Sequence, residues 1–585
     1  MNCHHPNPQF ARSGFISLNG LWSCRFDSGK SGAERQWEQS RGFETPINVP
    51  FCPESKLSGI GNTDFIECLW YHRTFMIPEA WQGKLILLHF GGVDYKCNVF
   101  VNGRKAGSHT GGASPFTVDI TGFVEAEKEN HLVLEVHDDL RSHDQAFGKQ
   151  APWYNSKQCS YTRTTGIWSN VFMECCNTLS LTRCRITPDV DNGAFHFAPE
   201  FRTLPRKSRF KVTLFEDEKE IASAETFVSP GVHLTVALDE PRPWSPETPF
   251  LYNIKYEVFD SCGKLTDEVF SYAGLRKFHI ENERFYLNNE PIFLRMVLDQ
   301  GFYEDGLWTA PDDAALENDI RLAQRAGFNG ARLHQKIFDP RYHYHADRLG
   351  FLTFGEFPDW GMGFWQHFTK SPCDVYRSFR DYFSQWREIL ERDMNHPSII
   401  GWTPFNETRD YRDLDEHRRI LSDIYRFTKQ LDPTRPVCDS SGYVHSETDI
   451  WSVHTYAGDP GSLAETLATV PVYCLEPENE LQAYKKQPYF VAEYGGVKYI
   501  PEGRTPWKGG SWGYGATPAS REDTLKRMRE LTAVIVNSGA AGFCYTQLTD
   551  IEQEQNGVYN YDRTEKFTEE EMQAVFQQKP QWSKY

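Results

Sequence analysis

The sequence has no run of 18 or more apolar residues, and its first 20 residues contain neither a basic nor an apolar segment. A membrane-spanning helix needs about 20 apolar residues, and a secretory signal needs both of those segments. We therefore expect a cytoplasmic protein with no membrane partner. The net charge of −18 and the lack of a long basic run argue against a nucleic-acid partner, since binding nucleic acid requires a basic face.

Cysteine pairs with CxxC spacing are also absent, although the chain contains 14 cysteines. Structural zinc sites and thiol–disulfide enzymes commonly use such pairs. Without a secretory signal, scattered cysteines are expected to be free thiols. We therefore predict no metal and no cofactor.

The composition that is present fits a multidomain enzyme. Of 585 residues, 39% are apolar and 24% are charged, which excludes a mostly disordered chain. At about 150 residues per domain, this length predicts three or four domains, and three if one is a large barrel.

The first half of the chain has the pattern of antiparallel β-structure. Short apolar runs with alternation are separated by glycine, proline and asparagine, and Asn102-Gly103 is a typical hairpin turn. Residues 1–178 are predicted to form a jelly-roll-like, sugar-binding-like β-sandwich. Residues 179–276 have the length and strand pattern of an immunoglobulin-like β-sandwich.

From residue 277 to 585, apolar strands alternate with helical segments. This alternation predicts a (β/α)8 TIM barrel. The eight candidate strands are 292–296, 328–333, 351–354, 398–405, 436–439, 449–453, 489–493 and 541–546. The longest candidate helices are 311–326, 339–348, 375–394, 411–431 and 519–537.

Carboxylates recur where the barrel strands should end. Glu356, Glu407 and Glu493 each end or follow a predicted strand, and active sites of TIM barrels lie at these strand ends. Hydrolysis of a glycosidic bond needs one protonated carboxyl and one carboxylate on opposite sides of the anomeric carbon. Glu407 and Glu493 could supply this pair, although a lone glutamate at a strand end can also anchor a loop.

Five motifs, in order, resemble glycoside hydrolase family 2 along essentially the whole chain. They are TGIWSNVFMEC (165–175), FYLNNEPIFLRMV (285–297), AGFNGARLH (326–334), the pair Asn406-Glu407, and AEYGG (492–496). The resemblance implies two β-sandwiches followed by a catalytic barrel. It further implies Glu493 as nucleophile, Glu407 as acid/base and Asn406 as a ligand of the sugar 2-hydroxyl.

Two further residues resemble family positions near the nucleophile. Tyr456 could orient Glu493 and lower its pKa, or it could be a buried aromatic residue of a loop. Arg332 could face the nucleophile or form a structural ion pair with a barrel carboxylate.

The sugar is suggested by a departure from the family pattern. Family glucuronidases carry an Asn-x-Lys signature that binds the uronate carboxylate, whereas this chain has Asn556-Gly557-Val558. Arg332, His334 and Lys336 could instead form a cationic pocket. Such a pocket would favour a sugar acid, so we expect a retaining exo-β-hexuronidase. Its resemblance to glucuronidase-like relatives that lack the lysine signature implies a preference for β-galacturonide over β-glucuronide. A β-galactosidase-type enzyme for neutral sugars is the alternative, and a non-catalytic carbohydrate-binding protein is a remote one.

Other residues complete the predicted site for a small glycoside or oligosaccharide. Glu356, Trp360 and Trp512 are predicted to contact substrate. The two tryptophans belong to the loops 356–368 and 505–515, which also contain Trp365 and Trp507. Aromatic packing under these loops is the alternative. Asp299 could contact a sugar hydroxyl or cap its loop. A metal-dependent hydrolase using His334, His454 and Asp299 is a further alternative. By analogy with the family, a homo-oligomer is expected.

Overall fold

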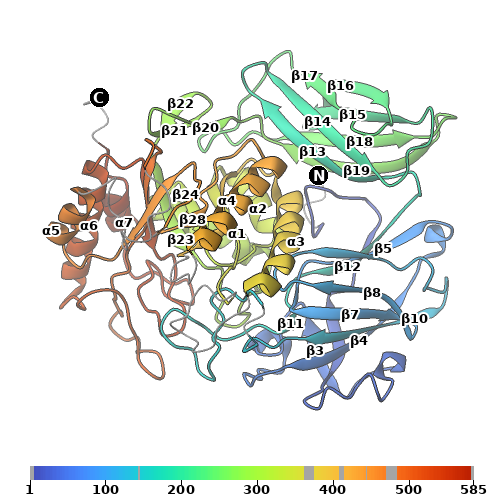
Figure 1. The fold of residues 1–585 in the computed structure, drawn as a ribbon, viewed down its shortest axis with the longest axis horizontal. Helices are drawn as coiled ribbons and strands as arrows, with labels where there is room; N and C mark the ends of the chain where they lie inside the picture. Colours follow the sequence, from blue (N-terminus) through green and yellow to red (C-terminus); the bar gives the residue numbers. More distant parts are fainter. Residues whose placement is uncertain are drawn as a thin grey trace.

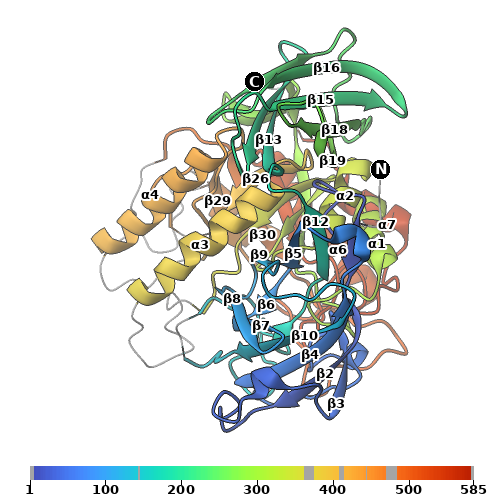
Figure 2. The same cartoon turned by 90° about the vertical axis from the view of Figure 1, so that its right-hand side faces the viewer.

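The protein was examined as a computed structural model, which describes residues 5–142, 145–361, 375–407, 414–442, 444–468 and 484–580. Figure 1 shows two β-rich domains stacked beside a larger domain of strands and helices. The view turned by 90° in Figure 2 shows the same order, with helices α3 (Val375–Asp393) and α4 (Leu414–Leu431) on the flank of the larger domain. The predicted fold class, two β-sandwiches and a TIM barrel, is confirmed.

The first domain is a sandwich whose main sheets have the strand orders β1-β12-β5-β9 and β3-β2-β4-β10-β7-β8. Apolar residues of both sheets, such as Leu88 of β5 and Leu134 of β10, form one buried core between them. The strands are β1 (Phe15–Ser17), β2 (Gly20–Phe26), β3 (Thr45–Val49), β4 (Cys68–Met76), β5 (Leu85–Phe90), β6 (Val93–Asp94), β7 (Lys96–Val101), β8 (Arg104–Thr110), β9 (Phe116–Asp119), β10 (Glu129–His137), β11 (Gly166–Ile167) and β12 (Val171–Cys176).

The second domain is a smaller sandwich with strand orders β13-β14-β17 and β16-β15-β18-β19. Along β18, buried residues alternate with half-exposed ones, as expected for a strand of a two-layer β-structure. The strands are β13 (Leu181–Asp189), β14 (Ala194–Phe201), β15 (Arg209–Glu216), β16 (Lys219–Phe227), β17 (Leu234–Ala237), β18 (Tyr252–Phe259) and β19 (Leu265–Ala273).

A small sheet of β20, β21 and β22 leads into the barrel, whose parallel sheet has the order β26-β25-β24-β23-β31-β30-β29. The barrel strands are almost wholly buried, which is typical of parallel strands covered by helices. The strands are β20 (Phe278–Glu281), β21 (Arg284–Leu287), β22 (Glu290–Ile292), β23 (Leu294–Asp299), β24 (Gly330–Leu333), β25 (Leu352–Glu356), β26 (Ile399–Thr403), β27 (Phe405–Asn406), β28 (Ser440–Ser441), β29 (Trp451–Thr455), β30 (Tyr489–Gly495) and β31 (Gly542–Thr546).

The fifth barrel strand, predicted at 436–439, is the least regular. Only Val437 forms a bridge there, with Trp402, and the short strand β28, which pairs with β27, begins three residues later at Ser440. Asp439 explains the shift, because its carboxylate accepts hydrogen bonds from the backbone N–H groups of Ser440 at 2.8 Å and Ser446 at 2.7 Å. Such local side-chain bonds replace ladder bonds and turn the chain.

The helices begin and end at capping residues that the sequence displays. Asp312 accepts from the N–H of Ala315 at the start of α1, and Pro340 begins α2 after the cap Asp339. Gly350, with φ of 68°, ends α2 in the left-handed region. The remaining helices are α1 (Asp313–Arg325), α2 (Pro340–Leu349), α5 (Pro460–Ala468), α6 (Arg521–Asn537) and α7 (Glu569–Phe576), of which α5 and α7 were not predicted.

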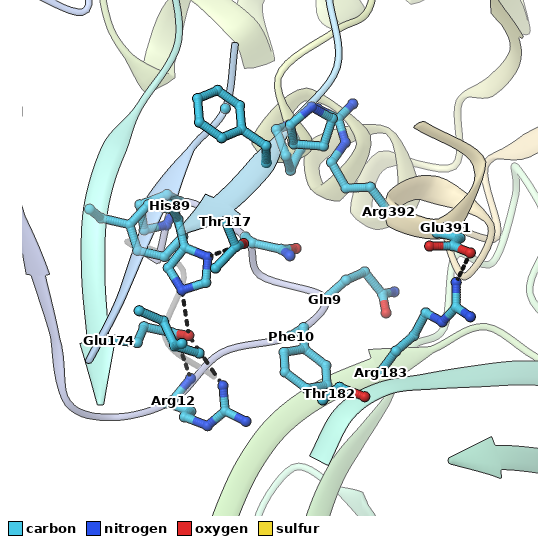
Figure 3. Close-up of a pocket in the computed structure, with 18 of the residues that line it drawn as sticks. Gln9, Phe10, Arg12, His89, Thr117, Glu174, Thr182, Arg183, Glu391 and Arg392 are labelled. Carbon is cyan, nitrogen blue, oxygen red and sulfur yellow. Dashed lines mark hydrogen bonds and ion pairs between the residues drawn. The ribbon is translucent and has the colours of Figure 1, made fainter. Parts of the chain in front are cut away.

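A cavity of about 400 Å³ marks the place where the two sandwiches and α3 meet (Figure 3). Arg12 contacts Asp267 of β19 at 2.9 Å as well as Glu174 of its own domain at 3.2 Å, and Arg183 contacts Glu391 of α3 at 2.6 Å. These arginines therefore join the domains through ion pairs within the protein.

Within the part of the chain that the structure describes, no helix combines the length and apolar character needed to cross a membrane. The cysteines whose surroundings are described are free thiols, as predicted.

Candidate active site

Glu493 lies near the end of β30, where it is buried and accepts hydrogen bonds from two side chains. Arg332 donates from Nη1 at 2.9 Å, and the hydroxyl of Tyr456 donates at 2.6 Å. Burial by itself raises the pKa of Glu493, and the neighbouring Glu407 acts in the same direction, but the electrostatic interactions with His454 and with the guanidinium of Arg332 outweigh both and leave that pKa below its ordinary value. Glu493 is therefore ionised at neutral pH, as a carboxylate nucleophile must be.

Glu407 follows β27 directly and faces Glu493. Its backbone has a φ of 53°, in the left-handed region that few non-glycine residues adopt, and its N–H donates to the carbonyl of Ser441 at 2.7 Å. One carboxylate oxygen of Glu407, one of Glu493 and a ring nitrogen of His454 all lie within 4.8 Å of one another. The two glutamates predicted from the strand ends are thus brought together.

His454, on β29, lies between the two carboxylates. Its Nδ1 is 2.7 Å from Glu407 and 3.5 Å from Glu493. On the other side, its Nε2 is 2.8 Å from the hydroxyl of Ser441. The sequence singled out His454 only as a metal ligand, because nothing in the spacing shows that β29 places it between strands four and seven.

Arg332, at the end of β24, organises the floor of the site. It donates to Glu356 at 2.5 Å through Nε and to Asn406 Oδ1 at 2.5 Å through Nη2, besides its bond to Glu493. Both alternatives proposed for this residue therefore hold geometrically, because one guanidinium faces the candidate nucleophile and also pairs with a buried barrel carboxylate. Its planar fork can satisfy several acceptors at once.

Asn406 presents a free amide group. Its Oδ1 is occupied by Arg332, whereas its Nδ2 is buried and has no hydrogen-bond partner among the described residues. A buried donor without a partner is costly, and a hydroxyl of a bound sugar would satisfy it.

The other predicted cations and Asp299 are placed differently. His334 Nδ1 is 2.7 Å from Glu356, so this histidine lies beside the floor of the site. Lys336 instead donates to the backbone carbonyls of Gly301 and Trp308, at 2.6 Å for the latter. Asp299 accepts from the N–H of Gly301 at 2.9 Å, which is a loop-capping contact.

This arrangement bears on the metal-site alternative. His334, His454 and Asp299 do not form one of the groups of close potential metal ligands found among the described residues. The group that includes His454 also adjoins Arg332, whose Nη1 lies 3.4 Å from Nε2 of His454 and whose positive charge opposes a cation there.

The two predicted tryptophans make separate contacts. Trp360 donates from its indole nitrogen to the carbonyl of Asn406 at 3.3 Å. Trp512 donates to the carbonyl of Gln158 at 2.7 Å and packs edge-on against Tyr514, which stacks on Tyr456 at 3.4 Å. The predicted loop residue Trp365 lies outside the described residues.

The first domain contributes residues that the sequence gave no reason to place in the barrel. Tyr161 donates to Glu554 at 2.5 Å, and Glu554 accepts from Asn556 Nδ2 at 3.0 Å. Lys149 is buried with its ammonium 4.0 Å from the ring centre of Trp360. Their approach depends on how two domains dock, a relationship that leaves no local pattern in a sequence.

Comparison with known domain families gives three matches, in chain order. The sugar binding domain of Glycosyl hydrolases family 2 matches residues 60–173. The domain described as Glycosyl hydrolases family 2 matches residues 183–276. The TIM barrel domain of the same family matches residues 278–503.

Comparison with individual proteins agrees. The chain is 27% identical over 439 residues to a β-glucuronidase of Paenibacillus borealis, covering 72% of each. It is 26% identical over 444 residues to a β-galactosidase of Thermoanaerobacter pseudethanolicus, covering 74% of this chain but only 54% of that protein. A structure of β-glucuronidase from Ruminococcus gnavus in complex with D-glucuronic acid shares the fold, with a TM-score of 0.79 at 18% identity over 96% of this chain and 98% of that one. The chain belongs to glycoside hydrolase family 2 and is a glycoside hydrolase.

Proposed function

We propose that the protein is a retaining exo-β-glycosidase that removes a terminal β-linked hexuronic acid by double displacement. The observation that supports this mechanism is the spacing of the two carboxylates: one oxygen of Glu407 lies within 4.8 Å of one oxygen of Glu493. Retaining glycosidases have carboxyl groups about 5–5.5 Å apart, whereas inverting enzymes need about 6.5–9.5 Å to hold a water between them.

The roles follow from the surroundings of each carboxylate. Glu493, kept ionised by Arg332 and hydrogen-bonded by Tyr456, attacks the anomeric carbon and forms a glycosyl–enzyme ester. Glu407 gives its proton to the departing oxygen, then removes a proton from the water that attacks the ester. The free Nδ2 of Asn406 donates to the sugar 2-hydroxyl.

Two observations support a sugar acid. The relatives that match include β-glucuronidases, and Arg332 and His334 make the floor of the site rich in nitrogen donors. A preference for galacturonide over glucuronide is proposed because Val558 stands where glucuronidases have the carboxylate-binding lysine. Val558 is buried and apolar, so it offers no donor to the carboxylate of either uronide. Galacturonide and glucuronide differ only in the configuration of the 4-hydroxyl, and we propose that the altered site discriminates between them there.

A panel of p-nitrophenyl β-galacturonide, β-glucuronide and β-galactoside tests the substrate. We expect the highest kcat/KM on the galacturonide, followed by the glucuronide. NMR of the first product should show the β-anomer, because two displacements retain configuration. An α-anomer as first product would contradict the proposed roles of both glutamates.

The second candidate is a β-galactosidase-type enzyme for neutral sugars. It is favoured by the contacts of Lys336, whose ammonium donates hydrogen bonds to two backbone carbonyls. Lys336 therefore does not contribute its charge to the predicted cationic pocket for a sugar acid. The β-galactosidase relative agrees with it. Highest turnover on the neutral galactoside in the same panel would establish this candidate and refute the uronide proposal.

A further inference from the structure

A loop of the first domain docks directly on the barrel next to the candidate active site. The N–H groups of Phe147 and Gly148 both donate to the carbonyl of Trp360, at 2.8 and 3.1 Å. Gly148 has a φ of 62°, and a Cβ added there would lie 2.5 Å from the backbone oxygen of Gln335. Only glycine allows this close approach, so the position of the next residue, Lys149, relative to the barrel is fixed by backbone contacts.

Lys149 is held over the barrel at both ends. The N–H of Tyr161 donates to its carbonyl at 2.7 Å, and its ammonium lies 4.0 Å from the ring centre of Trp360. The indole of Trp360 in turn donates to the carbonyl of Asn406. The ring of Trp360 therefore lies between the ammonium of Lys149 and the backbone of Asn406, next to Glu407.

The charge of Lys149 is not matched by an ion pair. Its exposed fraction is 6%, yet it takes part in none of the ion pairs that the described residues form within 4.0 Å. Lys566, by contrast, is equally buried and pairs with Asp550 at 2.6 Å. An unpaired buried ammonium is costly, and an anionic ligand group would offset that cost.

The surrounding groups keep Lys149 charged. Burial lowers its pKa, but Cys159 and the carboxylates Glu554 and Glu493 outweigh burial and leave that pKa above its ordinary value. Glu407 acts on it in the same direction, and Lys149 in turn lowers the pKa of His334. The ammonium of Lys149 therefore lies in the electrostatic field of the two candidate catalytic carboxylates, with the ring of Trp360 as its direct neighbour.

We propose that Lys149, presented by the first domain, binds the carboxylate of the sugar acid and replaces the barrel lysine that is absent at Val558. This inference rests on the proposed hexuronidase function and adds the residue that sets its specificity. The competing explanation is that Lys149 only balances the negative charge of Glu554, Glu493 and Glu407. The two explanations differ in substrate dependence, because a balancing charge serves every substrate equally.

The test compares Lys149→Met with the parent enzyme on p-nitrophenyl β-galacturonide, β-glucuronide and β-galactoside. We expect the ratio of uronide to galactoside kcat/KM to fall about 10- to 100-fold, chiefly through KM on the uronides, as loss of a charge-assisted hydrogen bond requires. Lys149→Arg, which keeps the charge, should retain part of the ratio. Lys157→Met removes an exposed lysine of the same loop and should leave the ratio unchanged.

The outcomes separate the two proposals. If the parent enzyme cleaves the uronides and Lys149→Met lowers all three substrates equally, Lys149 is not the carboxylate ligand, while the hexuronidase function stands. If the parent enzyme prefers the galactoside, the proposed function fails and this inference fails with it. If Lys149→Met does not fold, Lys149→Gln takes its place, and inhibition by free D-galacturonate is compared with inhibition by D-galactose. We expect Lys149→Gln to lose inhibition by galacturonate selectively. An unchanged ratio of the two inhibition constants would overturn the proposal.

Discussion

The hydroxyl of Tyr161 in the first domain donates a 2.5 Å hydrogen bond to the carboxylate of Glu554 in the barrel, and Gln300 donates to the same hydroxyl at 2.9 Å. Both groups are buried, so this contact joins two domains where water does not compete for it. The docking of the first domain on the barrel is therefore held in part by buried side-chain hydrogen bonds.

Tyr161→Phe tests the strength of this contact. The variant leaves Glu554 with one donor fewer in a buried place, which should destabilise the protein by about 1–3 kcal/mol. Calorimetry should show a lower Tm than for Tyr154→Phe, a change at an exposed tyrosine of the same segment. Equal Tm values for the two variants would show that the contact contributes no stability.

The two candidate catalytic carboxylates should respond differently to substitution. Glu407→Gln removes the proton donor and should lower kcat about 10²- to 10⁴-fold on a poor leaving group. Glu493→Gln removes the nucleophile and should abolish turnover. Azide distinguishes them, since it should give a β-glycosyl azide with Glu407→Ala and an α-glycosyl azide with Glu493→Ala. The opposite pairing would reverse our assignment, and Glu570→Gln on the surface serves as the control.

Tyr456 should shape the acid side of the pH profile. Its hydroxyl donates to Glu493 at 2.6 Å and so favours the charged carboxylate, holding its pKa down. Activity needs this carboxylate ionised and is lost as pH falls through its pKa. In Tyr456→Phe the pKa of Glu493 rises, so the acid limb of kcat/KM should move to higher pH, with kcat lower. Tyr286→Phe, remote on β21, should leave the limb in place; an unmoved limb in Tyr456→Phe would contradict the orienting role.

Lys336 should make stability depend on pH in the alkaline range. Burial lowers its pKa to about 7, while Asp299 and Asp319 act in the opposite direction. Between this value and the ordinary lysine pKa, the unfolded chain binds a proton that the folded protein does not, so stability rises with pH. The Tm of the parent relative to Lys336→Met should therefore increase from pH 7 to pH 9. A constant difference, as expected for the exposed-site variant Lys264→Met, would show that Lys336 stays protonated.

Much of the architecture follows from local pattern. The alternation between 1 and 276 predicted two sandwiches, and the change to strand–helix alternation at 277 predicted the barrel. Caps such as Asp312 and Gly350 lie close to the observed helix ends because capping is a short-range hydrogen-bonding effect. The fifth strand lies where it was predicted but is shortened to one bridge between Val437 and Trp402, and it is followed by Asp439, whose carboxylate accepts backbone hydrogen bonds in a way that periodicity does not reveal.

The sequence by itself determined the fold class, the family and the positions of Glu407, Glu493 and Asn406, because strand ends of a barrel converge and the motifs around them are specific. Only the tertiary structure placed His454 between the two carboxylates, turned Lys336 toward backbone carbonyls and brought Lys149 and Tyr161 from the first domain to the barrel. The reason is physical: hydrophobic periodicity records which face of an element is buried, whereas contacts between distant side chains depend on how whole domains pack.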